Sequence, residues 1–300
     1  MIAIHKFIKV ISLITKSNSL SLGYQKYYSC TMNKLNYLVP HDFTEVGDTA
    51  LDYASNLAIR SQAEVYLVHI VKKESHKDEA KEKLLEIIQR KKNEMPKLKL
   101  GGSVKTGNIF EDIASTAAKV ESNLVIMGTH GAKGMQKVLG SFAMKVVTST
   151  NLPFLIIQSG VSMNRVERIV FPVDVDVESV QIMNVATYMA RLFQAEVHLI
   201  APTQTDNMLS RRIINNMKVV AKQLKKNEIE YVTKLIAGGG SFSSKTMEYT
   251  KTVDGNMIAL SINNEGQIIS LNKFAQGVIT NEDKIPALIV NSISVTSTYF

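Results

Sequence analysis

The stretch LVIMGTHGAKGMQKVLGS, residues 124–141, joins a continuous apolar run to a glycine-rich segment. The run Leu124–Met127 predicts a buried strand, and the apolar spacing in FAMKVVTS predicts a helix from about Ser141. Glycine lets backbone amides approach an anion without a Cβ in the way, and a helix start offers further amides. The stretch therefore predicts a loop that cradles a phosphate, with a tight structural turn as the alternative. The glycines concerned are Gly128, Gly131 and Gly140.

Alternating strands and helices surround this stretch in the first half of the chain. Helical spacing predicts a helix capped by Asp48, a second over Lys77–Met95 and a third over Ile109–Val120. Near-continuous apolar strands that alternate with helices favour a parallel sheet covered on both faces. Ligands of such sheets bind beyond the carboxyl ends of the strands. The five predicted strands are Tyr37–Val39, Val65–Val71, Leu98–Val104, Leu124–Met127 and Phe154–Ile157.

The pattern recurs about 132 residues later along the chain. QAEV occurs at 62–65 and again at 194–197, and Pro40 with Asp42 matches Pro172 with Asp174 at the same offset; Asn123 and Pro153 match Asn256 and Pro286 at 133. These ordered anchors indicate a tandem duplication. We expect one domain over residues 32–160 and a second over residues 165–292.

Residues 1–31 stand apart from both copies. Their apolar stretch, Phe7–Ile14, is broken by Lys9 and is too short for a membrane span. We expect this segment to be a disordered leader or an upstream extension from a misassigned start, with an export signal as the alternative.

Charge and cysteine content narrow the classes of function. Of the formal charge of +8, four lysines without an acid lie in residues 1–31. Residues 32–160 carry seventeen basic and fourteen acidic groups, and residues 161–300 carry fourteen and thirteen. Basic and acidic residues that are interspersed in this way argue against nucleic-acid binding, and we expect no membrane partner. A single cysteine, Cys30, excludes an internal disulfide framework and fits a cytoplasmic location.

Four segments together resemble the universal stress protein family. They are VPHDFTE after the first strand, AEVYLVHIV, LVIMGTHGAKGMQKVLGS and NLPFLIIQ, and the resemblance spans residues 33–292 as two copies. It implies two tandem Rossmann-like (adenine nucleotide alpha hydrolase-like) α/β domains, each a five-stranded parallel sheet flanked by helices. It also implies a role in stress regulation rather than a defined reaction, with an ATP site in some members and none in others.

The pattern of the ATP-binding members implies a set of ligand residues in the first copy. It places Pro40 and Asp42 beside the nucleoside, Gly128 and Gly131 near the phosphates, and the Gly-Ser pair at the end of the loop. His41 and His130 follow the same strands and are expected to face the same crevice. The family usually has nine residues between its second glycine and the Gly-Ser pair, whereas this chain has eight, Ala132–Leu139. The expected set for ATP with Mg²⁺ is Pro40, His41, Asp42, Gly128, His130, Gly131, Gly140 and Ser141.

The second copy lacks this cradle. At the same offset Gly128 falls on Ser261, Gly131 on Asn264, and the Gly-Ser pair on Lys273 and Phe274. We therefore expect no phosphate site there and predict that the second copy is an intrachain partner of the first, as in a pseudo-dimer. The GGG at 238–240 is predicted to be a loop.

Catalytic motifs are sparse, so we predict a regulatory protein rather than an enzyme. The sequence holds no Ser-His-Asp order, no paired carboxylates at a recognisable spacing and no GxxxxGK[ST] loop. Slow ATP hydrolysis, with Asp42 or His130 orienting water, is one alternative, and a ligand-free protein-interaction module is another. His41, His69 and His130 could hold zinc, but no spacing motif supports a metal and we predict none. Monomers and homodimers of the tandem chain both remain open.

Overall fold

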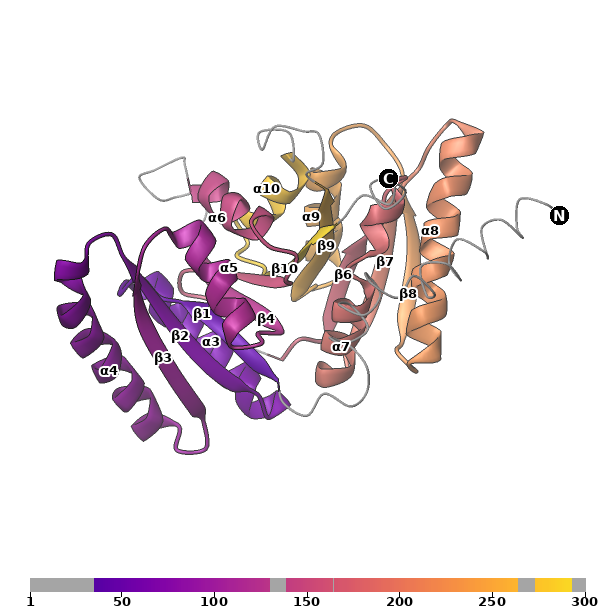
Figure 1. The fold of residues 1–300 in the computed structure, drawn as a ribbon. Helices are drawn as coiled ribbons and strands as arrows, with labels where there is room; N and C mark the ends of the chain where they lie inside the picture. The colour runs from indigo at the N-terminus through magenta and orange to yellow at the C-terminus, as the bar shows by residue number, and fades with distance from the viewer. Residues whose placement is uncertain (1–34, 130–138, 164, 264–272, 293–300) are drawn as a thin grey trace, which may run out of the picture. The chain divides into compact units, whose positions relative to one another are not determined.

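The computed structural model describes residues 35–129, 139–163, 165–263 and 273–292 (Figure 1). Contacts divide the chain into two units, Met1–Leu35 and Asn36–Phe300. The predicted leader, residues 1–31, lies outside the described residues, so the architecture below is that of the second unit. In the described part of the chain, no helix is both long enough and apolar enough to cross a membrane.

Ten strands of the described unit form one sheet in the order β3-β2-β1-β4-β5-β10-β9-β6-β7-β8. Every neighbouring pair is parallel except β5 and β10, which are antiparallel. The predicted α/β class, with parallel strands flanked by helices, is confirmed, but the two predicted five-stranded sheets are joined through β5 and β10 into one sheet. The strands are β1 (Asn36–Pro40), β2 (Glu64–Val71), β3 (Lys99–Thr106), β4 (Leu124–Thr129), β5 (Phe154–Gln158), β6 (Arg168–Pro172), β7 (Glu196–Pro202), β8 (Tyr231–Ile236), β9 (Met257–Asn263) and β10 (Ala287–Ser292).

Helices cover both faces of the sheet. The chain moves along the sheet from β1 to β3, reverses, and continues through β4 to β5. Right-handed crossovers therefore place the first two helices on one face and the next two on the other. The helices are α3 (Glu45–Ser61), α4 (Lys77–Glu94), α5 (Ile109–Lys119) and α6 (Leu139–Thr148), then α7 (Met183–Phe193), α8 (Asn207–Lys226), α9 (Phe242–Thr252) and α10 (Lys273–Ile279), with 3₁₀ turns η1 (Glu74–His76) and η3 (Val177–Val180).

The strand registers of the two halves repeat at the offset found in the sequence. Asn36 pairs with Glu64 between β1 and β2, and Arg168 pairs with Glu196 between β6 and β7, each residue 132 positions later. The β1–β4 register recurs between β6 and β9, where the β9 residues lie 133 positions after those of β4. These registers support the proposed duplication, although the domain boundaries stay predictions.

Several element boundaries differ from the sequence-based expectation, and two of the differences lie just after β1 and at the end of β4. The first helix begins at Glu45 with Thr44 as its N-cap, so the prediction that Asp48 caps it is wrong. The reason is that Asp42 supplies the carboxylate at this helix start, where its Oδ1 accepts bonds from the Thr44 N–H (3.1 Å) and hydroxyl (2.6 Å). β4 continues beyond Met127 because its next two residues pair with β5.

The two halves meet through buried strands and polar contacts. Gln158, at the end of β5, donates from Nε2 to the carbonyl oxygens of Ile279 (3.2 Å) and Asn281 (2.7 Å). On the helices, Arg60 Nε donates to the Leu192 carbonyl at 3.0 Å, and its guanidinium lies 5.0 Å from the Phe193 ring centroid. The second half therefore covers surface that the first half alone would expose.

Replacing Gln158 with alanine tests this junction. The variant removes a buried donor from two carbonyl oxygens of the other half, so we expect a loss of about 1–3 kcal/mol in the free energy of unfolding. Urea denaturation measures it. Gln89→Ala is the control, because that side chain is exposed on α4 and donates to its helix neighbour Asn93. Equal losses in the two variants would contradict the assigned role of Gln158.

Candidate functional site

A cleft opens at the carboxyl ends of β1, β2 and β4, where the sheet topology reverses direction. Its volume is about 140 Å³, close to that of an engineered cavity of about 150 Å³ that binds benzene. The cleft therefore has room for one ring-sized group. Most of its lining is apolar and comes from both faces of the sheet, with Val46, Val68, Ile70, Ile109, Ile113 and Met127 as the larger side chains.

The structure brings half of the predicted ligand residues to this cleft. Those that line it are Pro40, His41, Asp42 and Gly128. Gly140 and Ser141 lie in the first turn of α6, whose residue Ala143 also lines the cleft. His130 and Gly131 lie outside the described residues.

Asp42 is exposed at the mouth of the cleft and braces the local backbone. Its Oδ1 holds the N–H and the hydroxyl of Thr44, as described above, and this turn starts α3. A carboxylate that accepts two such bonds is already fixed in position. Asp42 therefore orients the start of α3, and a ligand contact would be additional to that role.

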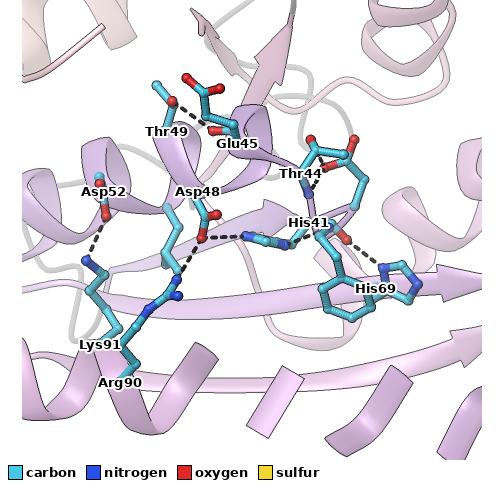
Figure 2. A network of polar contacts seen from close by, with 12 residues as sticks. His41, Thr44, Glu45, Asp48, Thr49, Asp52, His69, Arg90 and Lys91 are labelled. Carbon is cyan, nitrogen blue, oxygen red and sulfur yellow. Dashed lines mark hydrogen bonds and ion pairs between the residues drawn. The ribbon is translucent and has the colours of Figure 1, made fainter. Parts of the chain in front are cut away.

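His41 follows β1 and is 3% exposed. Its Nδ1 accepts a bond from the Phe43 N–H at 3.0 Å, so the ring proton lies on Nε2. Figure 2 shows the ring directed toward Asp48, which also bonds to Arg90. The Nε2–Asp48 Oδ1 distance is 3.6 Å, beyond hydrogen-bond range, and Nε2 has no hydrogen-bond partner among the described residues.

Burial lowers the pKa of His41 below its usual value. The carboxylates of Asp48 and Asp42 oppose this shift, while His69 adds to it. The folded protein therefore favours the neutral imidazole at this position.

A stacked aromatic pair lies beside His41 at the same edge of the sheet. The rings of Phe43 and His69 are 3.9 Å apart at an interplanar angle of 21°. His69 Nδ1 donates to the His41 carbonyl oxygen at 2.7 Å (Figure 2). Phe43 has a φ of 63°, a strained conformation for a bulky residue. The stack and the Phe43 N–H bond hold this strained residue at the cleft.

Gly128 is required by helix packing. A Cβ at this position would lie 2.3 Å from the Val46 carbonyl oxygen and 2.5 Å from Val46 Cγ1. Only glycine therefore lets the first turn of α3 approach β4 this closely. The contact explains this glycine without a ligand, and a phosphate role for Gly128 stays a prediction.

Thr129, the next residue, presents an unsatisfied hydroxyl at the cleft. Because successive strand residues point to opposite faces and Gly128 faces α3, the Thr129 side chain faces α5 and α6. The residue is 3% exposed and lines the cleft. Its Oγ1 has no hydrogen-bond partner among the described residues. Buried hydroxyls almost always have a partner, so this atom is a candidate contact for a polar ligand group.

The second half differs at the equivalent positions. Ser261 stands where Gly128 does in the first half, and its Oγ accepts a bond from the Ile182 N–H at 3.0 Å. Asn216 of α8 donates from Nδ2 to the carbonyl oxygens of the loop after β6, at 2.8 Å for Asp174. The backbone polar groups of that region are therefore already hydrogen-bonded to side chains of the protein itself. The GGG at 238–240 lies between β8 and α9, as predicted.

Among the described residues, no group of three His, Cys, Asp or Glu side chains is placed to hold a metal ion. His41 and His69 are the two described histidines of the zinc hypothesis. They are joined by a hydrogen bond from the His69 ring to the His41 carbonyl oxygen, and their ring nitrogens do not converge.

Sequence reasoning missed Thr129 and Phe43 as parts of the site, and it named His69 only as a zinc candidate. Thr129 carried one usable signal, since it directly follows a glycine at the end of an apolar strand. The aromatic stack joins residues of two strand ends and left no signal in a single sequence.

An α/β sheet with a cleft at its switch point is typical of the Rossmann-like, doubly wound class of folds. Residues 36–158 match the family model described as Universal stress protein family. A universal stress protein of Methanocaldococcus jannaschii is 27% identical over 138 residues, which cover 40% of this chain and 80% of that protein. Over this segment the chain is similar to the universal stress protein family.

Two solved structures are similar over both halves. A universal stress protein from Archaeoglobus fulgidus has a TM-score of 0.68 at 17% identity, covering 85% of this chain and 98% of that chain. A functionally unknown protein from Pseudomonas aeruginosa has a TM-score of 0.63 at 14% identity, covering 89% of this chain and 95% of its own. At these identities the likeness shows the fold.

Substituting Gly128 with alanine tests the close approach of α3. The new methyl group would overlap the Val46 backbone, so we expect the free energy of unfolding to fall by about 1–3 kcal/mol. The control is Gly101→Ala on β3, where the nearest atom to a Cβ is 3.8 Å away. We expect a change within about 0.5 kcal/mol for this control. A Gly128 variant as stable as wild type would show that α3 does not pack as described.

The lowered pKa of His41 predicts a pH dependence of stability. Between the unfolded-state pKa of about 6.5 and the lower folded-state value, the unfolded chain binds more protons, so stability falls as the pH falls through this window. His41→Asn keeps an acceptor for the Phe43 N–H and removes the titrating group. Urea midpoints from about pH 7.5 to about pH 5 should fall less in this variant than in wild type. The exposed His76→Asn serves as the control, and an unchanged slope in His41→Asn would exclude this residue as the cause.

Proposed function

We propose that the protein acts in a stress response by binding a nucleotide, with ATP as the expected ligand, in the cleft of its first half. The unsatisfied, buried Thr129 hydroxyl is the observation that carries this proposal. It lies in a largely apolar cleft with room for one ring. A heteroaromatic base or a ribose matches that combination, because it buries apolar faces and still offers polar edge atoms.

The described residues fit the nucleoside part of such a ligand. Pro40 and Asp42 lie at the mouth, and Thr129 supplies a hydroxyl on the side of α5 and α6. The phosphates would extend toward the N-terminus of α6, where amides favour negative charge. Mg²⁺ would reduce the repulsion between these phosphates and the Asp42 carboxylate. The predicted loop residues His130 and Gly131 would complete the phosphate-binding end of the site.

The second half is proposed to be a non-binding partner in an intrachain pseudo-dimer. Support comes from the Ser261 hydroxyl, which is already bonded to the Ile182 N–H. The strand position equivalent to Thr129 is Ile262, a buried apolar residue. This half therefore has no counterpart of the hydroxyl that carries the proposal.

Regulation by binding, rather than turnover, is the proposed mode of action. Hydrolysis would need a free base near the phosphates. Of the two residues predicted to orient water, Asp42 already accepts two bonds from Thr44 at Oδ1, and His130 lies outside the described residues. A cytoplasmic location stays a prediction from the sequence.

Thermal and urea unfolding with and without Mg-ATP tests the binding proposal. At about 100 times its dissociation constant, a ligand of the native state stabilises it by roughly 2.7 kcal/mol. Thr129→Val removes the hydroxyl at nearly constant volume, so we expect Mg-ATP binding to weaken by about tenfold in titration calorimetry. Thr187→Val is the matched control, because that equally buried hydroxyl bonds within its own helix to Met183.

Each result separates the proposal from its alternatives. No stabilisation by Mg-ATP, ADP or AMP would reject nucleotide binding and leave a ligand-free interaction module. Phosphate release that disappears in Asp42→Asn or in His130→Asn would instead identify slow hydrolysis.

A further inference from the structure

The exposed apolar side chains of the described residues gather at one edge of the sheet. Of the seven large apolar residues that are exposed, four lie on α8 and β8. They are Met208 (74% exposed), Ile214 (38%), Val232 (40%) and Leu235 (45%). Concentrated apolar exposure of this kind marks interaction surfaces.

β8 is an edge strand with open hydrogen-bonding groups on one side. Among the described residues it pairs only with β7. The carbonyls of Glu230 and Ile236 accept bonds from Val197 and Thr203, at 2.9 and 3.0 Å. Backbone groups alternate in direction along a strand, so every second residue of β8 turns its N–H and C=O outward. These residues are Tyr231, Thr233 and Leu235.

The neighbouring helix presents an unbalanced positive charge. α8 contacts β8 (Figure 1) and contains six basic residues and no acid. Arg211, Lys218, Lys222 and Lys225 recur at steps that place them on one face, opposite the buried residues Ile213, Met217, Val220 and Leu224. This basic stripe is about 21 Å long at 1.5 Å per residue.

The equivalent helix of the first half shows that such a charge excess is not required by the fold. On α4, Lys81 bonds to Asp78 at 2.7 Å and Lys83 bonds to Glu79 at 2.6 Å. In contrast, the four residues of the α8 stripe form no ion pair with any described residue. The positive charge of the stripe is therefore not neutralised by carboxylates of the described residues.

We propose that the edge of β8 and the basic stripe of α8 form one docking surface, the basic edge, for an acidic polypeptide segment that adds to β8 as a strand. The outward N–H and C=O groups of β8 would pair with the backbone of that segment. Side chains of such a strand alternate between the two faces of the sheet. Its carboxylates would face the α8 side and meet the stripe, and its apolar residues would cover Val232 on the opposite face, where the paired His198 contacts α9. A stripe of about 21 Å matches a strand of roughly six residues.

Charge argues against occupants from this chain. The segments outside the described residues contain a single acidic residue, Glu265, whereas residues 1–31 carry four lysines. A second copy is also disfavoured, because the other sheet edge, β3, carries Lys99 and Lys105 and would place like charges opposite Lys234. An acidic segment of another protein satisfies both constraints.

Fluorescence anisotropy of the full chain with a labelled seven-residue peptide of alternating glutamate and valine tests the proposal. We expect saturable binding that weakens with added salt. The triple variant Lys218→Gln, Lys222→Gln and Lys225→Gln should weaken it by about tenfold, and N-methylation of alternate peptide amides should do so independently. The matched control changes the same number of lysines on α4, Lys81→Gln, Lys83→Gln and Lys92→Gln, and should change the affinity less than about twofold.

Several outcomes would overturn the proposal. One is equal weakening in the α4 control, which would indicate attraction to net charge alone. Another is an N-methylated peptide that binds as tightly as the unmodified one, which would exclude strand addition. Tighter binding of phosphatidylserine vesicles or single-stranded DNA than of the peptide, lost in the triple variant, would assign the basic edge to a membrane or to nucleic acid.

Discussion

The antiparallel pairing of β5 and β10 is the contact on which the ten-stranded sheet depends. Both strands are almost entirely buried, and each consists mainly of large apolar residues. In an isolated half, either strand would be an exposed apolar edge and a template for unwanted pairing. The pairing turns these two edges into the centre of one sheet and leaves β3 and β8 as its outer strands.

The duplication provides two similar frameworks, and a few side chains make them chemically different. The strand registers agree between the halves, yet the residue that faces the first helix is Gly128 in one and Ser261 in the other. The glycine admits the Val46 backbone next to β4, whereas the serine bonds to the start of α7. One position thus determines how closely a helix approaches the end of the central strand, and with it the shape of the adjoining cleft.

Much of the fold could be predicted from the sequence because it depends on local periodicity and on the repeat. The runs around Leu124 and Phe154 gave the strands, and the 132-residue offset gave the duplication. The site was less predictable, because two of its properties depend on residues far apart in the sequence. The Val46 contact explains Gly128, and the missing partner identifies Thr129. The bonds from Thr44 to Asp42 are local, and the Asp-x-Thr pattern was the available signal for the helix start. That start was misplaced at Asp48 because the bracing carboxylate, Asp42, lies before the helix.

An intrachain partner also changes which constraints act on each half. Once β10 covers β5, the second half satisfies the packing needs of the first whether or not it keeps a ligand cleft of its own. Its loop after β6 is tied by Asn216 of α8, so that helix is anchored on its inner face by apolar packing and by hydrogen bonds. The outer face of α8 is then not needed for packing, and its lysines do not need an ion-pair partner within the protein. The same duplication that fixes the sheet therefore leaves one half with a small cleft and the other with an exposed basic helix face.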